Sequence, residues 1–179
     1  MAEAFSNKLT RAAGIVTTSS SGAVGITSTI ITGISTVGVA VSDLVVNANF
    51  IAGTKVTEIG ADSVTVDRTS TNTTASSSQS VSFLGPTTAY TSAAATKSVL
   101  IGGTFANNTD NSVNLTVEVR DQSTAVSVAI ASKIPVPAGS SFVISDVGKT
   151  LLEATDEVVV YCDSANAIDA NLSVLTGVN

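Results

Sequence analysis

The stretch Val113-Asn114-Leu115-Thr116-Val117-Glu118-Val119-Arg120 alternates apolar and polar residues without interruption. Successive side chains of a β-strand point to opposite faces of a sheet, so the alternation places the four apolar side chains on one face. Such a face is stable only when a second layer of structure covers it. The stretch therefore predicts a half-buried strand in a protein built from at least two packed sheets.

Shorter alternating segments repeat this period elsewhere in the chain, and turn-forming residues separate them. The alternating segments are 64–66, 81–83, 126–130 and 172–174, and the turn signals lie at 107–111, 135–139, 146–148 and 163–166. The best helical signal is a single turn near 150–153. Strands at this spacing predict an all-β fold, an antiparallel β-sandwich of the jelly-roll or Ig-like type.

One segment has the low charge of a membrane span. No charged residue lies between Arg11 and Asp43, and the segment contains several Ile and Val residues. A membrane-spanning helix needs about 20 predominantly apolar residues, whereas Ser, Thr and Gly interrupt this segment at almost every second or third position. Its β-branched residues favour strands. We therefore expect short strands here and no contact with a membrane.

Composition divides the chain into two parts. Two tracts rich in Ser and Thr, 17–22 and 69–80, flank a segment with strand signals of its own. Those signals lie at 30–34, 37–41, 44–46, 55–59 and 63–66. We expect a small all-β domain, residues 17–84, inserted after the first strand (5–9) of a main sandwich formed by 1–16 and 85–179, with the two tracts as its necks. Two domains in series, joined near Gly85-Pro86, are the alternative.

Charge is scarce and acidic. Fourteen acidic and eight basic residues give a formal net charge of −6, and charged residues make up 12% of the chain, which is about half the usual share. The basic residues are dispersed, so they form no patch for a polyanion. We expect no nucleic-acid partner. A surface of hydroxyls and amides costs less to desolvate than one of ions, which favours contacts with other proteins.

Catalytic residue types are few. The chain has no His, the side chain most often used for general acid–base work near neutral pH. Paired carboxylates remain formally possible at Asp156 with Glu157, and at Asp110 with Asp121, which would face each other across the hairpin that contains residues 113–120. Adjacent strand residues point to opposite faces, so Asp156 and Glu157 should not converge. We interpret these carboxylates as solvated turn residues and expect no enzyme activity and no cofactor.

Metal ligands are equally sparse. Cys162 is the single cysteine, and without His it cannot complete a zinc site; its apolar neighbours predict a buried core thiol. The weak calcium candidates are Asp163, Asn166 and Asp169, whose oxygen atoms lie in one loop. A hairpin loop selects the same residues for their turn propensity, so the default expectation is no metal.

The first residues give no targeting signal. Glu3 precedes the first basic residue, Lys8, and no apolar core of signal-peptide length follows. We expect no signal peptide.

Several short motifs are informative beyond their periodicity. They are Ala2-Glu3-Ala4-Phe5-Ser6-Asn7-Lys8, then Thr88-Ala89-Tyr90-Thr91, then residues 98–108, 133–141 and 152–158. Together they resemble small structural proteins of tailed bacteriophage particles, particularly marine ones. In the resembling proteins the first two motifs are close in sequence, which supports the insertion. The middle segment, with residues 46–56 and 64–67, resembles a small β module that recurs inside other phage structural proteins. One turn departs from the pattern: where those proteins usually have Gly-Asp, this chain has Thr155-Asp156, and a β-branched residue tolerates positive φ poorly.

The resemblance implies a non-enzymatic structural protein of the virion, assembled in the host cytoplasm. The favoured expectation is a decoration (cement) protein on the capsid exterior, bound to the major capsid protein or other virion proteins and to copies of itself, as a trimer or another cyclic oligomer. A tail, neck or baseplate component is one alternative. A host-surface or carbohydrate-binding appendage is another, but it would need exposed aromatic side chains, and the two Tyr and five Phe residues lie mostly in strand patterns that predict a core. A virion hydrolase is least favoured.

Overall fold

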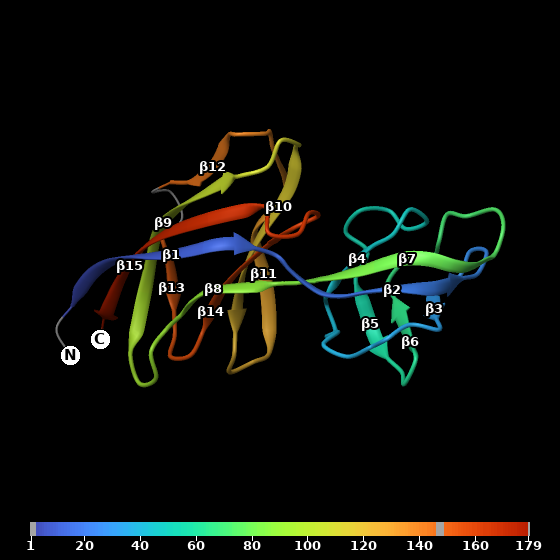
Figure 1. Cartoon of the computed structure of the whole chain (residues 1–179). Coiled ribbons are helices and arrows are strands. Elements are labelled where there is room, and N and C mark those ends of the chain that lie inside the picture. The colour runs from blue at the N-terminus through green and yellow to red at the C-terminus, as the bar shows by residue number, and fades with distance from the viewer. Residues whose placement is uncertain (1–2, 146–148, 179) are drawn as a thin grey trace. The chain divides into compact units, whose positions relative to one another are not determined.

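The protein is built from antiparallel β-strands. The computed structural model describes residues 3–145 and 149–178, and this part of the chain contains strands but no helix (Figure 1). The fold class predicted from the alternation, an all-β protein with packed antiparallel sheets, is confirmed. The turn expected at 146–148 lies outside the described residues. No helix long and apolar enough to cross a membrane occurs among the residues described.

The chain forms two compact units. One contains the chain up to Gly14 and again from Pro86 onward, and the other contains Ile15–Gly85. The sequence-based boundaries at 16/17 and 84/85 lie within two residues of these junctions. Because each unit has its own sheets, each is described by itself.

The larger unit contains two sheets. Its strands are β1 (Ala4–Ala13), β8 (Thr87–Thr91), β9 (Lys97–Asn107), β10 (Val113–Asp121), β11 (Val126–Val136), β12 (Ser141–Ile144), β13 (Thr150–Leu152), β14 (Glu157–Cys162) and β15 (Ile168–Val178). One sheet has the order β1-β15-β9-β12, with β13 also paired to β9, and the other has the order β11-β10-β14-β8. The helical turn expected near 150–153 is wrong, because Thr150–Leu152 pairs with residues 98–100 of β9 as a strand.

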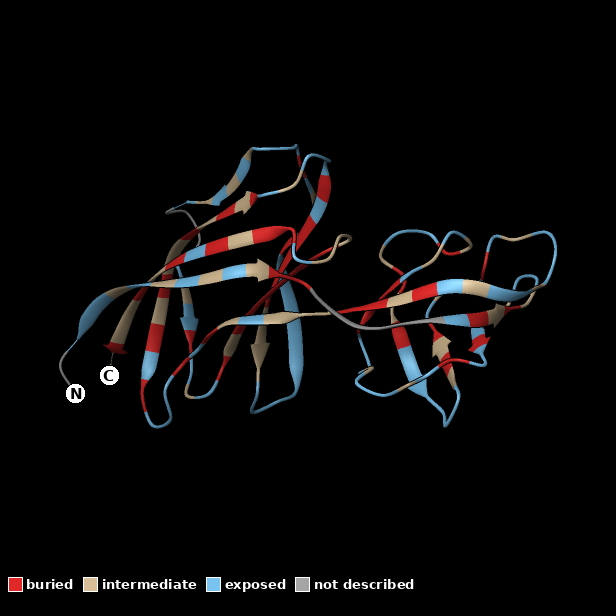
Figure 2. Cartoon of the chain, in the orientation of Figure 1, coloured by how far each residue is buried: buried red, intermediate tan, exposed pale blue. Residues whose placement is uncertain are grey.

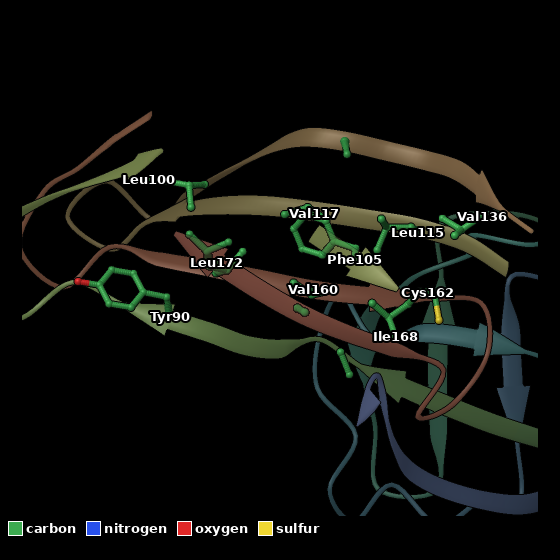
Figure 3. Packing of buried hydrophobic residues seen from close by; sticks show 14 of the residues in the cluster. Tyr90, Leu100, Phe105, Leu115, Val117, Val136, Val160, Cys162, Ile168 and Leu172 are labelled. Atoms are coloured by element: carbon green, nitrogen blue, oxygen red, sulfur yellow. The ribbon is translucent and has the colours of Figure 1, made fainter. Parts of the chain in front are cut away.

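The apolar side chains of these strands form one core. From β10, Val113, Leu115 and Val117 are buried as the alternation predicts, and they pack with Phe105 of β9 and Leu172 of β15 (Figure 3). Inward residues of the two sheets supply the rest of the cluster. The burial pattern changes along the strands in short buried and exposed bands, as expected for a period of two (Figure 2).

The middle of the opposite face of β10 is also buried, which the alternation does not predict. Thr116 is 7% exposed and Glu118 is 8% exposed. β10 is a central strand between β11 and β14, and Tyr161 of β14 lies directly opposite Thr116. The burial of these polar side chains therefore depends on the position of the strand in the sheet and not only on the residue pattern.

The smaller unit is a six-stranded sheet with the order β4-β7-β2-β3-β6-β5. Its strands are β2 (Ile15–Val24), β3 (Ile30–Thr32), β4 (Leu44–Val46), β5 (Val56–Ile59), β6 (Ser63–Val66) and β7 (Ser76–Gly85). The core of this unit is a cluster of buried apolar residues around Val24, Ile31, Val64, Val81 and Phe83.

Two expectations for this unit are wrong. The hydroxyl-rich tracts are not necks: residues 18–22 of β2 pair with 79–83 of β7, so most of the first tract and the end of the second lie inside the sheet. The strand expected at 37–41 is a region of turns, in which Val39 N donates to Thr36 O (3.1 Å) and Gly38 has a φ of 81°. The positive φ of Gly38, and that of Ser42 (77°) directly after the segment, interrupt an extended conformation there.

Candidate interaction surface

Strand β1 presents one face to the core and the other to the outside. Ser6 lies opposite the buried Val174 of β15, so even-numbered residues of this part of β1 face inward. Phe5 lies opposite Leu175 and points outward, with 64% of its surface exposed. An exposed aromatic ring therefore lies on the outer face of this sheet, at its β1 edge.

The sheet register extends Phe5 into an apolar row. Leu175 of β15 lies opposite Val99 of β9, and Val99 lies opposite Leu151 of β13, which is 50% exposed. Neighbouring strands are about 4.8 Å apart. Four strands thus contribute one apolar side chain each to a continuous outward row.

A second row runs across the same face. Leu9 of β1, 78% exposed, lies opposite Asn171 of β15; Asn171 lies opposite Thr104 of β9, and Thr104 lies opposite Val143 of β12, which is 54% exposed. Neither row contains a charged residue. We call the two rows together the apolar outer face; its members are Phe5, Leu9, Val99, Thr104, Val143, Leu151, Asn171 and Leu175.

Charge appears at both ends of this face. Two residues from Val99 and Leu151, Lys97 Nζ and Glu153 Oε1 form an exposed ion pair (2.9 Å). The other end carries Arg11 and Asp169. A shallow hollow of about 440 Å³ lies there, with Arg11 and Asp169 in its lining. Asp169 is committed to the fold, because its Oδ1 accepts from Ala12 N (2.8 Å) and from Asn108 Nδ2 (3.3 Å). The hollow is an open depression of the outer face, and one of its two charged side chains holds the end of β1 in place.

The structure gives the three calcium candidates separate roles. Asp163 binds β10, with Oδ1 accepting from Asn114 N (2.8 Å) and Oδ2 from Asn114 Nδ2 (2.6 Å). Asn166 adopts a φ of 55°, and its backbone N donates to Gly14 O (2.8 Å). Among the described residues, no group of three or more His, Cys, Asp and Glu side chains is placed to hold a metal ion.

The carboxylate pairs are also separated. Asp110 precedes β10 and Asp121 ends it, which puts about 25 Å of extended strand between them; the expectation that they face each other is wrong. Asp156 is 5% exposed, and its Oδ2 and Oδ1 accept from Glu153 N (2.9 Å) and Gln122 N (3.2 Å). The interpretation of Asp156 as a solvated turn residue is wrong too, since it is a buried cap that ties two loops together.

Tyr161 and Glu118 form a buried hydrogen bond between neighbouring strands. The Tyr161 hydroxyl donates to Glu118 Oε1 across the β10–β14 pair. Burial raises the pKa of Tyr161 above its usual value, and the bond to Glu118 raises it further. Both side chains are buried. This contact holds the non-core side of a central strand pair together.

Cys162 is a core residue, as predicted. Its side chain is fully buried, and its Sγ donates to Ser164 O (2.9 Å). Burial raises the pKa of the thiol, which disfavours the reactive thiolate.

Most aromatic side chains are buried, as the strand patterns predict. Those that are at most 9% exposed are Phe50, Phe83, Tyr90, Phe105 and Tyr161. Phe142 is partly buried against the core, and Phe5 is exposed. The sequence-based interpretation missed the apolar outer face, because the apolar residues of the first strand, Phe5 and Leu9, share one parity that the alternation would place in the core, whereas the register places it outside.

Comparisons of the chain with protein-family models, curated proteins and solved structures found no match. The fold and the surface by themselves define the class: an all-β protein of antiparallel sheets in two compact units, with exposed apolar side chains in a row across the outside of one sheet.

Proposed function

We propose that the chain is a non-enzymatic structural protein of a tailed phage particle that decorates the exterior of the capsid. The observation that carries this proposal is the apolar row Phe5, Leu175, Val99 and Leu151 across four strands. A cluster of exposed apolar side chains is typical of a surface that contacts another protein. The motif resemblance supplies the phage context.

The residue types of the face suit an assembly contact. Burying a large apolar side chain contributes about 1.5–3 kcal/mol, and the apolar outer face offers several such side chains in two rows that contain no charged residue. A rigid sheet also loses little conformational entropy when it binds. The partner that fits is a protein surface with an apolar, weakly charged patch, such as the major capsid protein or another virion protein.

Copies of the same chain are the second class of partner. Capsid sites repeat by symmetry, so a protein bound at each site lies near other copies in a cyclic arrangement. The net charge of −6 opposes self-association only weakly at a distance, because salt screens exposed charges beyond about 8–10 Å. Contacts between copies therefore depend on local surfaces.

Quantitative mass spectrometry of purified particles tests the proposal. A capsid decoration protein should be present in a fixed ratio to the major capsid protein, with a copy number on the order of hundreds that follows the shell lattice. A copy number near six or twelve would instead indicate that the protein lies in the tail, neck or baseplate. Absence from washed particles would overturn the structural role altogether.

A further inference from the structure

Strand β1 contains a β-bulge near its C-terminal end. Its register with β15 shifts by one residue between Thr10 and Ala13, so two residues of β1 lie against the single residue Asp169 of β15. Ala12, one of the two, has a φ of 56°. An extra residue of this kind changes the direction in which the side chains on one side of the bulge point.

The bulge decides which face of the sheet carries Leu9 and Phe5. Counted from Ala13, a ladder without the bulge would place Leu9 opposite the buried Leu172. The extra residue instead places Leu9 opposite the exposed Asn171, and Phe5, which has the same parity, points outward with it. A shift of one residue moves a whole set of side chains to the other face of a strand. The apolar outer face therefore depends on the bulge.

The chain is fixed on the C-terminal side of the bulge. Ala13 is fully buried, Gly14 N donates to Thr87 Oγ1 (2.9 Å), and Gly14 O accepts from Asn166 N (2.8 Å). A change in the bulge would therefore displace the part of β1 that precedes it, residues 4–11, which carries the exposed apolar side chains.

The observed register is unfavourable in three local respects. Ala12 adopts a positive φ, which is a strained conformation for a residue with a Cβ. Phe5 and Leu9 are 64% and 78% exposed. On the inner face, Ser6 Oγ is buried and has no hydrogen-bond partner among the described residues. A strained segment persists only when neighbouring groups hold it in place.

Asp169 supplies that hold from the opposite strand. Its Oδ1 accepts from Ala12 N (2.8 Å), and it also accepts from Asn108 Nδ2 (3.3 Å). The extra residue of a bulge lies outside the regular ladder of backbone hydrogen bonds. The carboxylate thus gives the Ala12 amide a partner that it would otherwise lack in this conformation.

Arg11 favours the same register but does not exclude the other one. Without the bulge, Arg11 would lie opposite the buried Ala170 and point inward. Lys8 already occupies an inward position of β1, with its Nζ 5.8 Å from the centre of the Tyr90 ring. The inner side of this edge strand therefore admits a long cationic side chain.

We propose that Asp169 is a positioning residue of the apolar outer face: by holding the bulge at Ala12, it keeps Phe5 and Leu9 on the outside of the sheet. Loss of its carboxylate allows the preceding part of β1 to shift by one residue. The shift moves both apolar side chains to the inner face and turns Ser6 outward. This role rests on the proposed function, since the face that Asp169 maintains is the proposed docking surface.

Thiol labelling of the isolated full chain measures the register directly. Asn7→Cys and Ser6→Cys place a thiol on the outer and on the inner face of β1. Asn7→Cys should label at least about tenfold faster, because a buried thiol reacts only during local opening. Adding Asp169→Ala should abolish or reverse this difference, since the shift exchanges the two faces. The native Cys162 is fully buried and gives the slow baseline.

Two further variants distinguish positioning from a general loss of stability. Asp169→Asn keeps an oxygen that can accept from Ala12 N, so the labelling difference should remain. Asp163→Ala is the matched control: it removes a carboxylate that accepts from a backbone amide elsewhere in the same unit, Asn114 N (2.8 Å). It should also leave the difference in place.

Deletion of Ala12 is the second test. Without the extra residue, Arg11 lies opposite Asp169 in a regular ladder and Asn7 stays on the outside. The deletion should therefore restore fast labelling of Asn7→Cys in the Asp169→Ala background, and it still tests the proposal if Asp169→Ala alone does not fold.

An unchanged labelling difference in folded Asp169→Ala, or no restoration by the deletion, would overturn the proposal. Because labelling uses the isolated chain, this failure is distinguishable from absence of the protein from particles.

Discussion

Phe5 of β1 lies directly opposite Leu175 of β15, so residues near the two ends of the chain form one pair on the outside of a sheet. The pair starts the apolar row that continues through Val99 to Leu151. Closing the sheet with the first strand therefore also builds the surface that we propose as the docking face. Fold and contact surface depend on the same strand.

Removal of the smaller unit should leave a folded sandwich. Ile15 pairs with Gly85, and Gly14 N donates to Thr87 Oγ1 (2.9 Å), so the two ends left by deleting residues 15–85 lie close together. Joining Gly14 to Pro86 through a short Gly-Ser linker should give a protein with a β-type circular dichroism spectrum and one cooperative unfolding transition. That outcome would support insertion of a separate domain, and an unfolded product would contradict it.

Deletion of residues 1–12 is the companion experiment. β1 pairs with β15 over most of its length, and Lys8 Nζ lies 5.8 Å from the centre of the Tyr90 ring. Loss of this strand would expose the edge of β15 and part of the core, at a cost of more than about 2 kcal/mol in the free energy of unfolding. Chemical denaturation measures this cost; an unchanged free energy would favour two domains in series.

Tyr161→Phe should destabilise the larger unit by about 1.5–3 kcal/mol, because the buried Glu118 carboxylate loses a hydroxyl donor. Tyr90→Phe is a matched control: the Tyr90 hydroxyl is hydrogen-bonded to the neutral hydroxyl of Ser98 (2.8 Å), and such a bond contributes only about 0.5–1.5 kcal/mol. Urea denaturation of both variants gives the comparison. A larger loss for Tyr90→Phe would refute the assigned difference.

Thr155→Gly should stabilise the protein by about 1 kcal/mol. Thr155 has a φ of 71°, and a β-branched residue held in that region is strained by about 1–3 kcal/mol, part of which is offset by the greater freedom of Gly in the unfolded chain. The backbone bond from Thr155 N to Ser92 O (3.1 Å) is retained in the variant. Thermal unfolding checks the sign; Thr155→Ala keeps a side chain at positive φ and should recover less of the strain.

Asp121 should titrate with a midpoint near pH 2 in the folded protein. Hydrogen bonds from Ser123 and then Thr124 lower its pKa from 3.8 to about 2. A lowered pKa means that the folded state binds this proton less readily than the unfolded state does, so the stabilisation is present above about pH 4 and is lost as the pH falls towards 2. Carboxyl NMR titration gives the midpoint, and Ser123→Ala should move it upward. No change in that variant would show that another group lowers the pKa.

The sequence predicts the fold class because the period of two is local information. The same local information does not say where a strand lies in its sheet. Leu115, in central strand β10, is fully buried, whereas Val128, in an equally regular alternation, is exposed on edge strand β11. The pairing order that makes one strand central and the other an edge depends on contacts between distant segments.

The misassigned tracts and the missed surface have the same origin. Ser and Thr tracts are typical of linkers, but residues 18–22 and 79–83 pair with each other, and neither tract alone contains that information. Likewise Phe5 is of a residue type that is usually buried. Only the strand register, which places it opposite Leu175, shows that it lies on the outside. The candidate calcium ligands share a loop in the sequence, yet Asp163 and Asp169 bond to different strands in the fold.

The most direct measurement of the central claim is the binding of added protein to particles that lack it, followed by sedimentation. The double variant Phe5→Ser, Leu151→Ser removes two exposed members of the apolar outer face, and Val37→Ser removes an 82% exposed apolar side chain of the other unit as a control. We predict that the double variant binds at least about tenfold more weakly, a loss of about 1.4 kcal/mol or more, while Val37→Ser binds like the unmodified chain. Equal binding of the double variant and the unmodified chain would contradict the account.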